Sequence, residues 1–252
     1  MTLTNVTFTD ETGYTTQLSP EGYAQSVLLD SGTSSTLLTD DVFSALANGF
    51  GAVYVGEDSY AVPCRFANIN ANFTYSFGGN GGPTVVVPVS QVVGSQILTP
   101  DDFADESGGC DFGFGPPIQG ASIMGDTFLR SAYVVFDIDN NLAALAQAAE
   151  NQSDTSSIAV IPSGTVIPGA SVTATAVGTQ LTGAAATEPP SVPTASVQGS
   201  SLLLPGTPTF NLGVSSTAAG SSATSSGAAN VAAAPTAALL GMGLAAGMMA
   251  FQ

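Results

Sequence analysis

The sequence predicts a mainly β domain, built from antiparallel strands, followed by a long segment with too few large apolar residues for a second core. As far as about residue 150, short runs of β-branched and aromatic residues alternate with turns rich in Gly, Pro and Asn. Eighteen of the 19 carboxylates lie at or before Asp154, and only Glu188 follows. Nearly all the aromatic residues and both cysteines also precede this break, so residues 1–150 can build one core.

The expected strands follow one another in short runs with turn residues on either side. Each run either alternates apolar with polar residues or is continuously β-branched and apolar. The short spacing between runs favours antiparallel pairing, because antiparallel neighbours can be joined by tight turns. The segments concerned are 2–9, 27–29, 73–77, 83–89 and 132–139.

One segment predicts a helix. In "DVFSALANGF", residues 41–50, the large apolar side chains recur on one side at helical spacing. Thr39 or Asp40 supplies the N-cap, and Gly49 or Gly51 supplies the stop.

The composition excludes several classes of function. Charged residues make up 8% of the chain, the only cations are Arg65 and Arg130, and the net charge is −17. Phosphate backbones and acidic headgroups are bound through Lys and Arg, so nucleic-acid binding is excluded as a primary role. The chain has no His, which removes Ser-His-Asp and Cys-His catalysis and His-based metal sites. We therefore expect neither a metal nor a cofactor, and acid–base chemistry carried by carboxylates, hydroxyls, Tyr or Cys.

Residues 151–226 are expected to form a disordered stalk. They consist mostly of Ala, Ser, Thr, Gly, Pro and Val, and offer too little apolar surface to offset the backbone entropy lost on folding. Stretches such as "GVSSTAAGSSATSSG" are typical of hydroxyl-rich stalks that carry O-linked sugar.

Residues 227–252 predict a glycosylphosphatidylinositol (GPI) attachment signal. The apolar run Ala237–Phe251 has 15 residues, short of the ~20 that span a bilayer, and no Lys or Arg follows it. Small residues, a spacer and a terminal apolar tail are the three parts of such a signal. Gly227 is the expected attachment residue, with Ser226 and Asn230 as alternatives. A plain Ala-rich end or a short helix is the competing interpretation.

Other features agree with passage through the secretory pathway and a place at the cell surface. Asn5, Asn72 and Asn151 each begin an Asn-X-Ser/Thr triplet, the acceptor for N-glycosylation. Two cysteines in an extracellular chain predict one disulfide, Cys64 to Cys110. The first 13 residues have no basic or apolar stretch of the kind found in signal peptides, which suggests that an N-terminal part is missing.

The chemistry is expected in "VLLDSGTSSTLL". Asp30 directly follows an apolar strand, where a carboxylate is costly unless hydrogen-bond donors surround it. Gly32 allows a tight turn that aims backbone N–H groups at Asp30, and Ser31 and Thr33 place hydroxyls beside it. The alternative is an ordinary Asp-Gly turn in which Asp30 caps its own backbone.

This segment resembles the second active-site motif of the pepsin-like aspartic proteases (peptidase A1). A second stretch, "SIMGDTFLRSAYVVFDIDNNLAALA" (122–146), resembles the family's block near the C-terminus, and the two cysteines lie where its C-terminal lobe has a disulfide. The resemblance covers residues 3–150 in order. It implies that residues 1–150 are the C-terminal lobe of a bilobal acid protease. The stalk and anchor resemble those of fungal, yapsin-like members.

The resemblance also implies an aspartic endopeptidase that acts on peptides at acid pH and contributes one Asp from each lobe. Two close carboxylates share a proton, one activating water and the other protonating the leaving nitrogen. Asp30 would be the C-lobe member, with Ser31 bridging the lobes through its hydroxyl and Gly32 and Thr33 holding the carboxylate. Three further residues would form the apolar loop behind Asp30: Ile123, Met124 and Gly125.

The sequence departs from the family pattern in one respect. Residues 1–29 contain no second Asp-Thr/Ser-Gly and no Tyr-bearing flap, so the chain corresponds to a C-lobe half whose partner, an N-terminal lobe, is missing. A symmetric pair supplying two Asp30 residues is a further possibility. The alternative function is a catalytically inactive, GPI-anchored cell-surface protein that keeps the lobe as a binding or structural module.

Overall fold

The structure is a computed structural model that describes residues 1–103, 105–139, 142–149, 167, 170, 207–210 and 230–233. Along the chain, its elements are β1 (Thr2–Thr9), β2 (Thr15–Gln17), β3 (Gln25–Leu29), β4 (Thr36–Leu37), α1 (Asp40–Phe50), β5 (Val53–Gly56), β6 (Ser59–Pro63), η1 (Cys64–Asn68), β7 (Asn72–Phe77), β8 (Thr84–Pro88), η2 (Val89–Gln91), β9 (Val93–Leu98), β10 (Gly109–Phe112), β11 (Phe114–Gly115), β12 (Ser122–Met124), α2 (Asp126–Leu129), β13 (Ala132–Asp137), β14 (Leu142–Gln147) and β15 (Asn230–Ala233).

The largest sheet has the strand order β11-β4-β12-β3-β1-β7-β8, with β2 paired to β1. The mainly β fold is therefore confirmed, and β1, β7 and β8 pair antiparallel as expected. Two pairs, β12 with β3 and β11 with β4, run parallel. Each joins strands that are far apart in the sequence and connected through other elements, which is the connection that parallel pairing requires.

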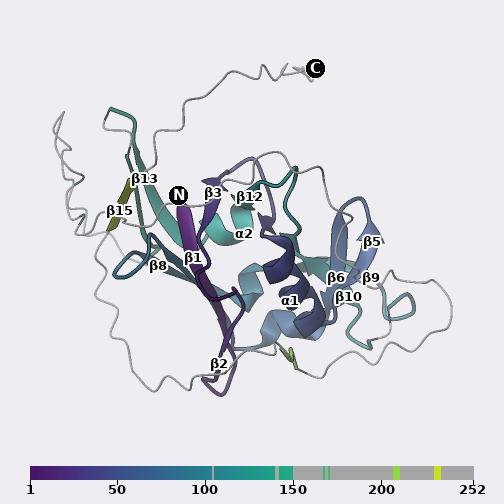
Figure 1. Cartoon of the computed structure of the whole chain (residues 1–252). Coiled ribbons are helices and arrows are strands. Elements are labelled where there is room, and N and C mark those ends of the chain that lie inside the picture. Colours follow the sequence, from purple (N-terminus) through teal and green to yellow (C-terminus); the bar gives the residue numbers. More distant parts are fainter. Residues whose placement is uncertain are drawn as a thin grey trace, which may run out of the picture.

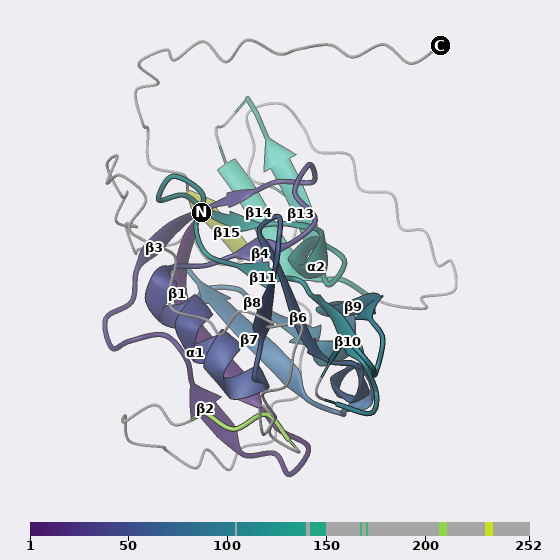
Figure 2. The same cartoon turned by 90° about the vertical axis from the view of Figure 1, so that its right-hand side faces the viewer.

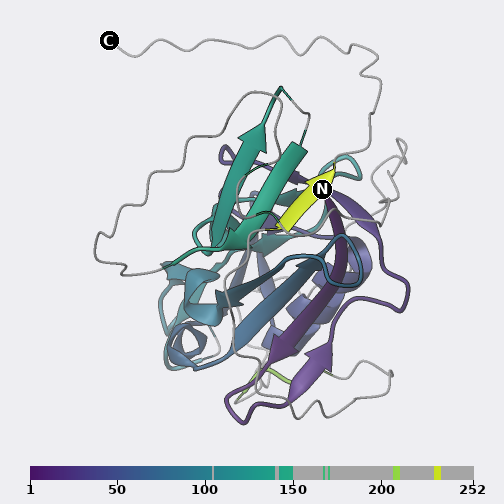
Figure 3. The ribbon, with the colours of Figure 1, turned by 90° about the vertical axis from the view of Figure 1, so that its left-hand side faces the viewer.

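Two smaller sheets flank the large one (Figures 1 and 2). One has the order β5-β6-β10-β9, and the other β13-β14-β15. The β13–β14 hairpin projects from the rest of the domain (Figure 3). Gln147 joins it to β8, because its side-chain amide accepts a hydrogen bond from the Val86 N–H and donates one to the Val86 carbonyl. The side chain thus pairs with the outer edge of the large sheet much as a strand would.

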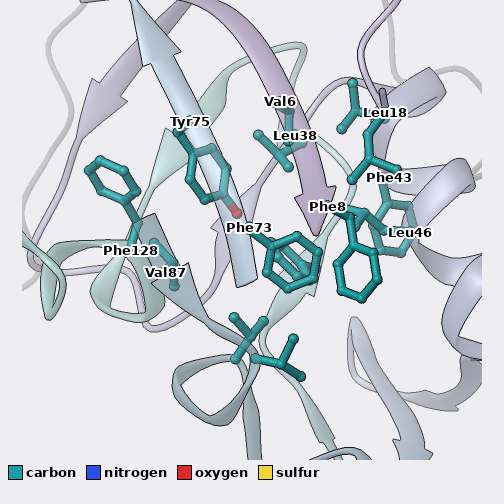
Figure 4. Close-up of a cluster of buried hydrophobic side chains, with 14 of the residues drawn as sticks. Val6, Phe8, Leu18, Leu38, Phe43, Leu46, Phe73, Tyr75, Val87 and Phe128 are labelled. Carbon is teal, nitrogen blue, oxygen red and sulfur yellow. The ribbon is translucent and has the colours of Figure 1, made fainter. Parts of the chain in front are cut away.

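Aromatic rings fill the core between the large sheet and α1 (Figure 4). The alternating side chains of β7, Phe73, Tyr75 and Phe77, are all buried, as the period of two predicts. Phe50, at the end of α1, lies against rings from three other parts of the chain, with centroids 5.3–5.7 Å apart: Phe8 of β1, Phe66 of η1 and Phe112 of β10. The helix therefore connects the large sheet to the four-stranded one.

The sequence left two candidates for each end of α1, and the structure shows that the helix begins after Thr39 and ends at Gly51. Thr39 is the N-cap residue, although its side chain makes no capping hydrogen bond, and two acidic residues, Asp40 and Asp41, occupy the first turn. Acidic groups there interact favourably with the helix dipole. At the other end Gly51 adopts a left-handed conformation with φ of 61° and closes the helix.

The predicted disulfide is present. Cys64, at the start of η1, is bonded to Cys110 of β10 across a sequence separation of 46 residues. The Cys64 N–H also donates to the Gly108 carbonyl at 3.0 Å, so η1 is held to the β10 region by a covalent and a hydrogen bond.

Only short pieces after residue 149 are described. Ile167 packs against Ala144 of β14, Thr207–Phe210 lies against α1, and the backbone of β15 pairs antiparallel with β14. The rest of the expected stalk and anchor, including Asn151, Gly227 and the apolar run 237–251, lies outside the described residues. Within the part that is described, no helix has the length and apolar character needed to cross a membrane.

Removal of the disulfide should measurably destabilise the domain. Replacing Cys64 and Cys110 together by Ala should lower the free energy of unfolding by about 4 kcal/mol, because the bond closes a long loop in the unfolded chain. Urea unfolding followed by circular dichroism measures the loss, and reduction of the unaltered protein should reproduce it. Equal midpoints for the oxidised, reduced and doubly substituted chains would contradict this expectation.

Candidate active site

Asp30 lies where β3 ends, at the centre of the large sheet. Its backbone N–H donates to the Met124 carbonyl at 3.1 Å, which continues the parallel pairing of β3 with β12 by one residue. Its carboxylate is solvent-accessible, whereas Val27 in the strand before it is buried. Asp30 therefore lies at the end of a central strand, where its side chain is open to solvent rather than enclosed by the sheet.

Two donors hold the Asp30 carboxylate. The Gly32 N–H donates to Oδ1 at 2.9 Å, and the Thr33 hydroxyl donates to Oδ2 at 2.7 Å. Both bonds favour the ionised form, so the Thr33 hydroxyl first and the Gly32 N–H second hold the pKa of Asp30 below its ordinary value. This is the arrangement that the sequence predicts for Gly32 and Thr33. Ser31 is exposed beside them.

The segment after β12 fixes the turn that carries Asp30. The Asp126 N–H donates to the Thr33 carbonyl at 2.8 Å, and the Thr127 N–H donates to the Ser34 carbonyl at 3.1 Å. A Cβ atom at Gly125 would lie 2.2 Å from the Ser35 oxygen and 2.4 Å from the Thr33 oxygen. Only glycine permits this approach, which explains why the sequence needs Gly125 there.

Ile123 and Met124 lie directly beside the strand that ends at Asp30. Ile123 pairs with Leu28 and Met124 with Leu29, and the Met124 side chain is fully buried. The structure thus brings all three residues of the expected apolar loop, Ile123 to Gly125, next to Asp30. Leu28, two residues before Asp30 on the same strand, is 57% exposed.

Two buried threonines, Thr36 and Thr127, which the sequence analysis did not identify, hold together the segments on either side of the Asp30 turn. The Thr127 hydroxyl donates to the Gly113 carbonyl at 3.1 Å. Its proton is thus used, so the Thr36 hydroxyl donates to Thr127 Oγ1 at 2.8 Å. The only signal in the sequence was a hydroxyl residue directly before the apolar Leu37–Leu38 pair.

The arrangement provides one oriented, ionised carboxylate. Such a group can accept a proton from water, but an ionised carboxylate cannot also donate one to a leaving group. Hydrogen bonds dominate the pKa shift of Asp30, and no like-charged neighbour from the described part of the chain contributes to it. Nor do the described residues contain a group of three or more His, Cys, Asp or Glu side chains able to hold a metal ion.

Comparison with known proteins gives a consistent result. The model of the family described as eukaryotic aspartyl protease matches residues 1–148. A probable aspartic-type endopeptidase, opsB of Aspergillus fumigatus, is 33% identical over 207 residues, covering 77% of this chain and 41% of the relative. Barrierpepsin of Saccharomyces cerevisiae is 35% identical over 131 residues, which are 52% of this chain and 20% of the relative. Secreted aspartic protease 7 of Candida albicans is 31% identical over 137 residues, which are 54% of this chain and 21% of the relative. The chain thus spans about two fifths, or less, of the length of these relatives.

Replacing Thr33 by Val should raise the pKa of Asp30 towards its ordinary value of 3.8, because the shape is kept while the main donor is lost. Carboxyl-carbon NMR titration measures it. The lowered pKa stabilises the fold above pH 3.8, and this contribution is lost as the pH falls through the native pKa. The part of the stability difference that comes from Asp30 ionisation should therefore vanish in strong acid.

A second Thr-Asp pair supplies the control. The Thr12 hydroxyl donates to Asp10 and lowers the pKa of that carboxyl in the same way. Thr12→Val should shift Asp10 alone, and Thr33→Val should shift Asp30 alone. An Asp30 titration that Thr33→Val leaves unchanged would remove Thr33 from the site.

Proposed function

Because the chain belongs to the eukaryotic aspartyl protease family, we propose that residues 1–150 form the C-terminal lobe of an aspartic endopeptidase, with Asp30 as one of its two catalytic aspartates. The observation that carries this proposal is the geometry at Asp30. A carboxylate at the end of a central strand has one donor on each oxygen and remains open to solvent. A carboxylate that served only to cap its own turn would not need a second segment to fix that turn, as Gly125 to Thr127 do here.

The second aspartate would come from a lobe outside this sequence. Asp-Ser/Thr-Gly occurs once in the 252 residues, at 30–32. The described part of the chain also leaves several large apolar side chains open to water, among them Leu28 beside Asp30 and three on or next to β13: Tyr133, Phe136 and Ile138. These exposed side chains are free to pack against a further structure. We assign that role to the N-terminal lobe.

In the completed site, the reaction would depend on one proton shared by two carboxylates. Two such groups a few ångströms apart cannot both ionise easily, so the pair keeps one proton at acid pH. The ionised member removes a proton from water, which attacks the peptide carbonyl, and the protonated member protonates the leaving nitrogen. The Gly32 N–H and the Thr33 hydroxyl would hold Asp30 in place for either role. Activity should fall as the pH rises, because the shared proton is lost.

The hydroxyl-rich segment 151–226 and the apolar run 237–251 support a location at the cell surface. One relative is named a secreted aspartic protease. Asn5 and Asn72 lie on β1 and β7 and are each half-buried, and Asn151 lies beyond the described residues. We propose N-glycosylation at these three positions and attachment of a GPI lipid at Gly227. The chain would then act on peptide or protein substrates outside the cell.

Replacing Asp30 by Asn in the enzyme completed with its N-terminal lobe should lower kcat/KM for peptide hydrolysis at acid pH by at least ~1,000-fold. The substitution removes the carboxylate and keeps its size. Asp41→Asn, on the exposed side of α1, makes the same change away from the site and should leave activity within about two-fold.

The same assay on the isolated chain, without an N-terminal lobe, should show no cleavage of peptides. Pepstatin-sensitive cleavage by the isolated chain would replace the two-lobe proposal with a symmetric pair of chains. Full activity of the Asp30→Asn enzyme would remove Asp30 from catalysis. A completed enzyme that is folded but inactive would favour an anchored binding module.

The anchor has its own test. Expressed behind a secretion signal, the full chain should remain on cells and be released by a phosphatidylinositol-specific phospholipase C. A chain that ends at residue 226 lacks the signal and should pass directly into the medium. Cell association that survives both the lipase and hydrofluoric acid would point instead to a spanning segment.

A further inference from the structure

Phe210 is the only aromatic residue between positions 137 and 250, and it lies against the core of the domain. Its ring centroid is 4.8 Å from that of Phe8 on β1 and 5.8 Å from that of Phe50 at the end of α1. Aromatic pairs at this separation gain energy beyond the area they bury. One residue of a segment otherwise poor in large apolar groups therefore extends the aromatic cluster of the domain.

The site that receives Phe210 is open because residue 49 has no side chain. A Cβ atom on Gly49 would lie 2.2 Å from Phe210 Cε1 and 2.4 Å from Cδ1. Gly49 is inside α1, where glycine is a poor helix former, and its φ is not in the left-handed region. The helix itself gives no reason for a glycine at this position, whereas the ring does.

The backbone of the same segment completes the hydrogen bonding of α1. The last four carbonyls of a helix lack partners within it. Those of Ala47 and Asn48 accept hydrogen bonds from the residues just after the helix. The next one, of Gly49, accepts a hydrogen bond from the Thr209 N–H at 2.9 Å. Thr209 and Phe210 thus make two different kinds of contact with the same turn of α1.

We propose that Thr207–Phe210 is a docking segment that binds, within its own chain, against Gly49, Phe50 and Phe8. Phe210 contacts the Phe8 end of β1, whereas Asp30 lies beyond the opposite end, where β1 meets β3. At ~3.3 Å per residue, β1 separates the two sites by roughly 20 Å. Figure 1 shows the segment, in green, near the end of α1 and far from β3.

The consequence is a contact between α1 and a segment far along the chain. The docking segment holds the chain to α1 at a point that lies, along the sequence, between β14 and β15. This contact is independent of the role of Asp30, and no charged group takes part in it.

A fluorescence experiment on the full chain tests the contact directly. The chain contains no Trp, so a single Trp introduced at position 210 reports on that position alone. Phe210→Trp should emit at shorter wavelength, and be quenched several-fold less by acrylamide, than the matched control Thr207→Trp, which labels an exposed residue of the same segment. Equal emission and equal quenching of the two proteins would overturn the proposal.

A double-mutant cycle at residues 49 and 210 tests the same contact through stability. The direction of the Tm change caused by Gly49→Ala distinguishes a docked from an undocked Phe210. In a chain that carries Phe210→Ala, the space beside residue 49 is free, so Gly49→Ala should raise Tm by about 2–4 °C through helix propensity. With Phe210 present, the new methyl group collides with the ring, and Gly49→Ala should lower Tm or fail to raise it. Added to the Phe210→Trp chain, Gly49→Ala should shift the indole emission to longer wavelength. An equal rise in Tm in both backgrounds would overturn the proposal.

Discussion

The packing of Phe50 is the interaction on which the arrangement of the domain depends. Its ring contacts Phe8 of the large sheet, Phe66 beside the disulfide and Phe112 of the four-stranded sheet. One side chain thus joins three parts of the domain. Gly51 ends the helix directly after it and thereby sets the point at which the ring enters the core. The disulfide and the docked Phe210 both lie around this cluster, and each adds to contacts that Phe50 already makes.

The position of Asp30 depends on a different constraint, the parallel pairing of β3 with β12. Strands joined in this way end at the same edge of the sheet, so Asp30 and Gly125 meet although 95 positions separate them. The close approach of the Gly125 backbone to two carbonyls and the buried Thr36–Thr127 hydrogen bond then leave the turn little freedom. In the function proposed for Asp30, this support would set the orientation of the carboxylate before substrate arrives.

Local patterns predicted much of this. The alternation in β7, the turn after Asp30 and the two cysteines each depend on neighbours in the sequence or on simple counting. The parallel pairing of β3 with β12 could not be derived from them, since it depends on how distant strands meet. The same holds for Phe210, which the composition of its surroundings assigned to a stalk. Composition averages over many residues, while docking here depends on one ring and the glycine opposite it.

The open edge of β13 has a consequence for the colloidal behaviour of the isolated chain. In the described sheet β13 is an outer strand, and Tyr133, Phe136 and Ile138 on or beside it are exposed. Unpaired edges with apolar side chains template pairing with further copies. Near neutral pH the net charge of −17 opposes this by mutual repulsion. In acid the carboxylates take up protons and that protection declines, so self-association competes with solubility at the acid pH that the proposed function requires.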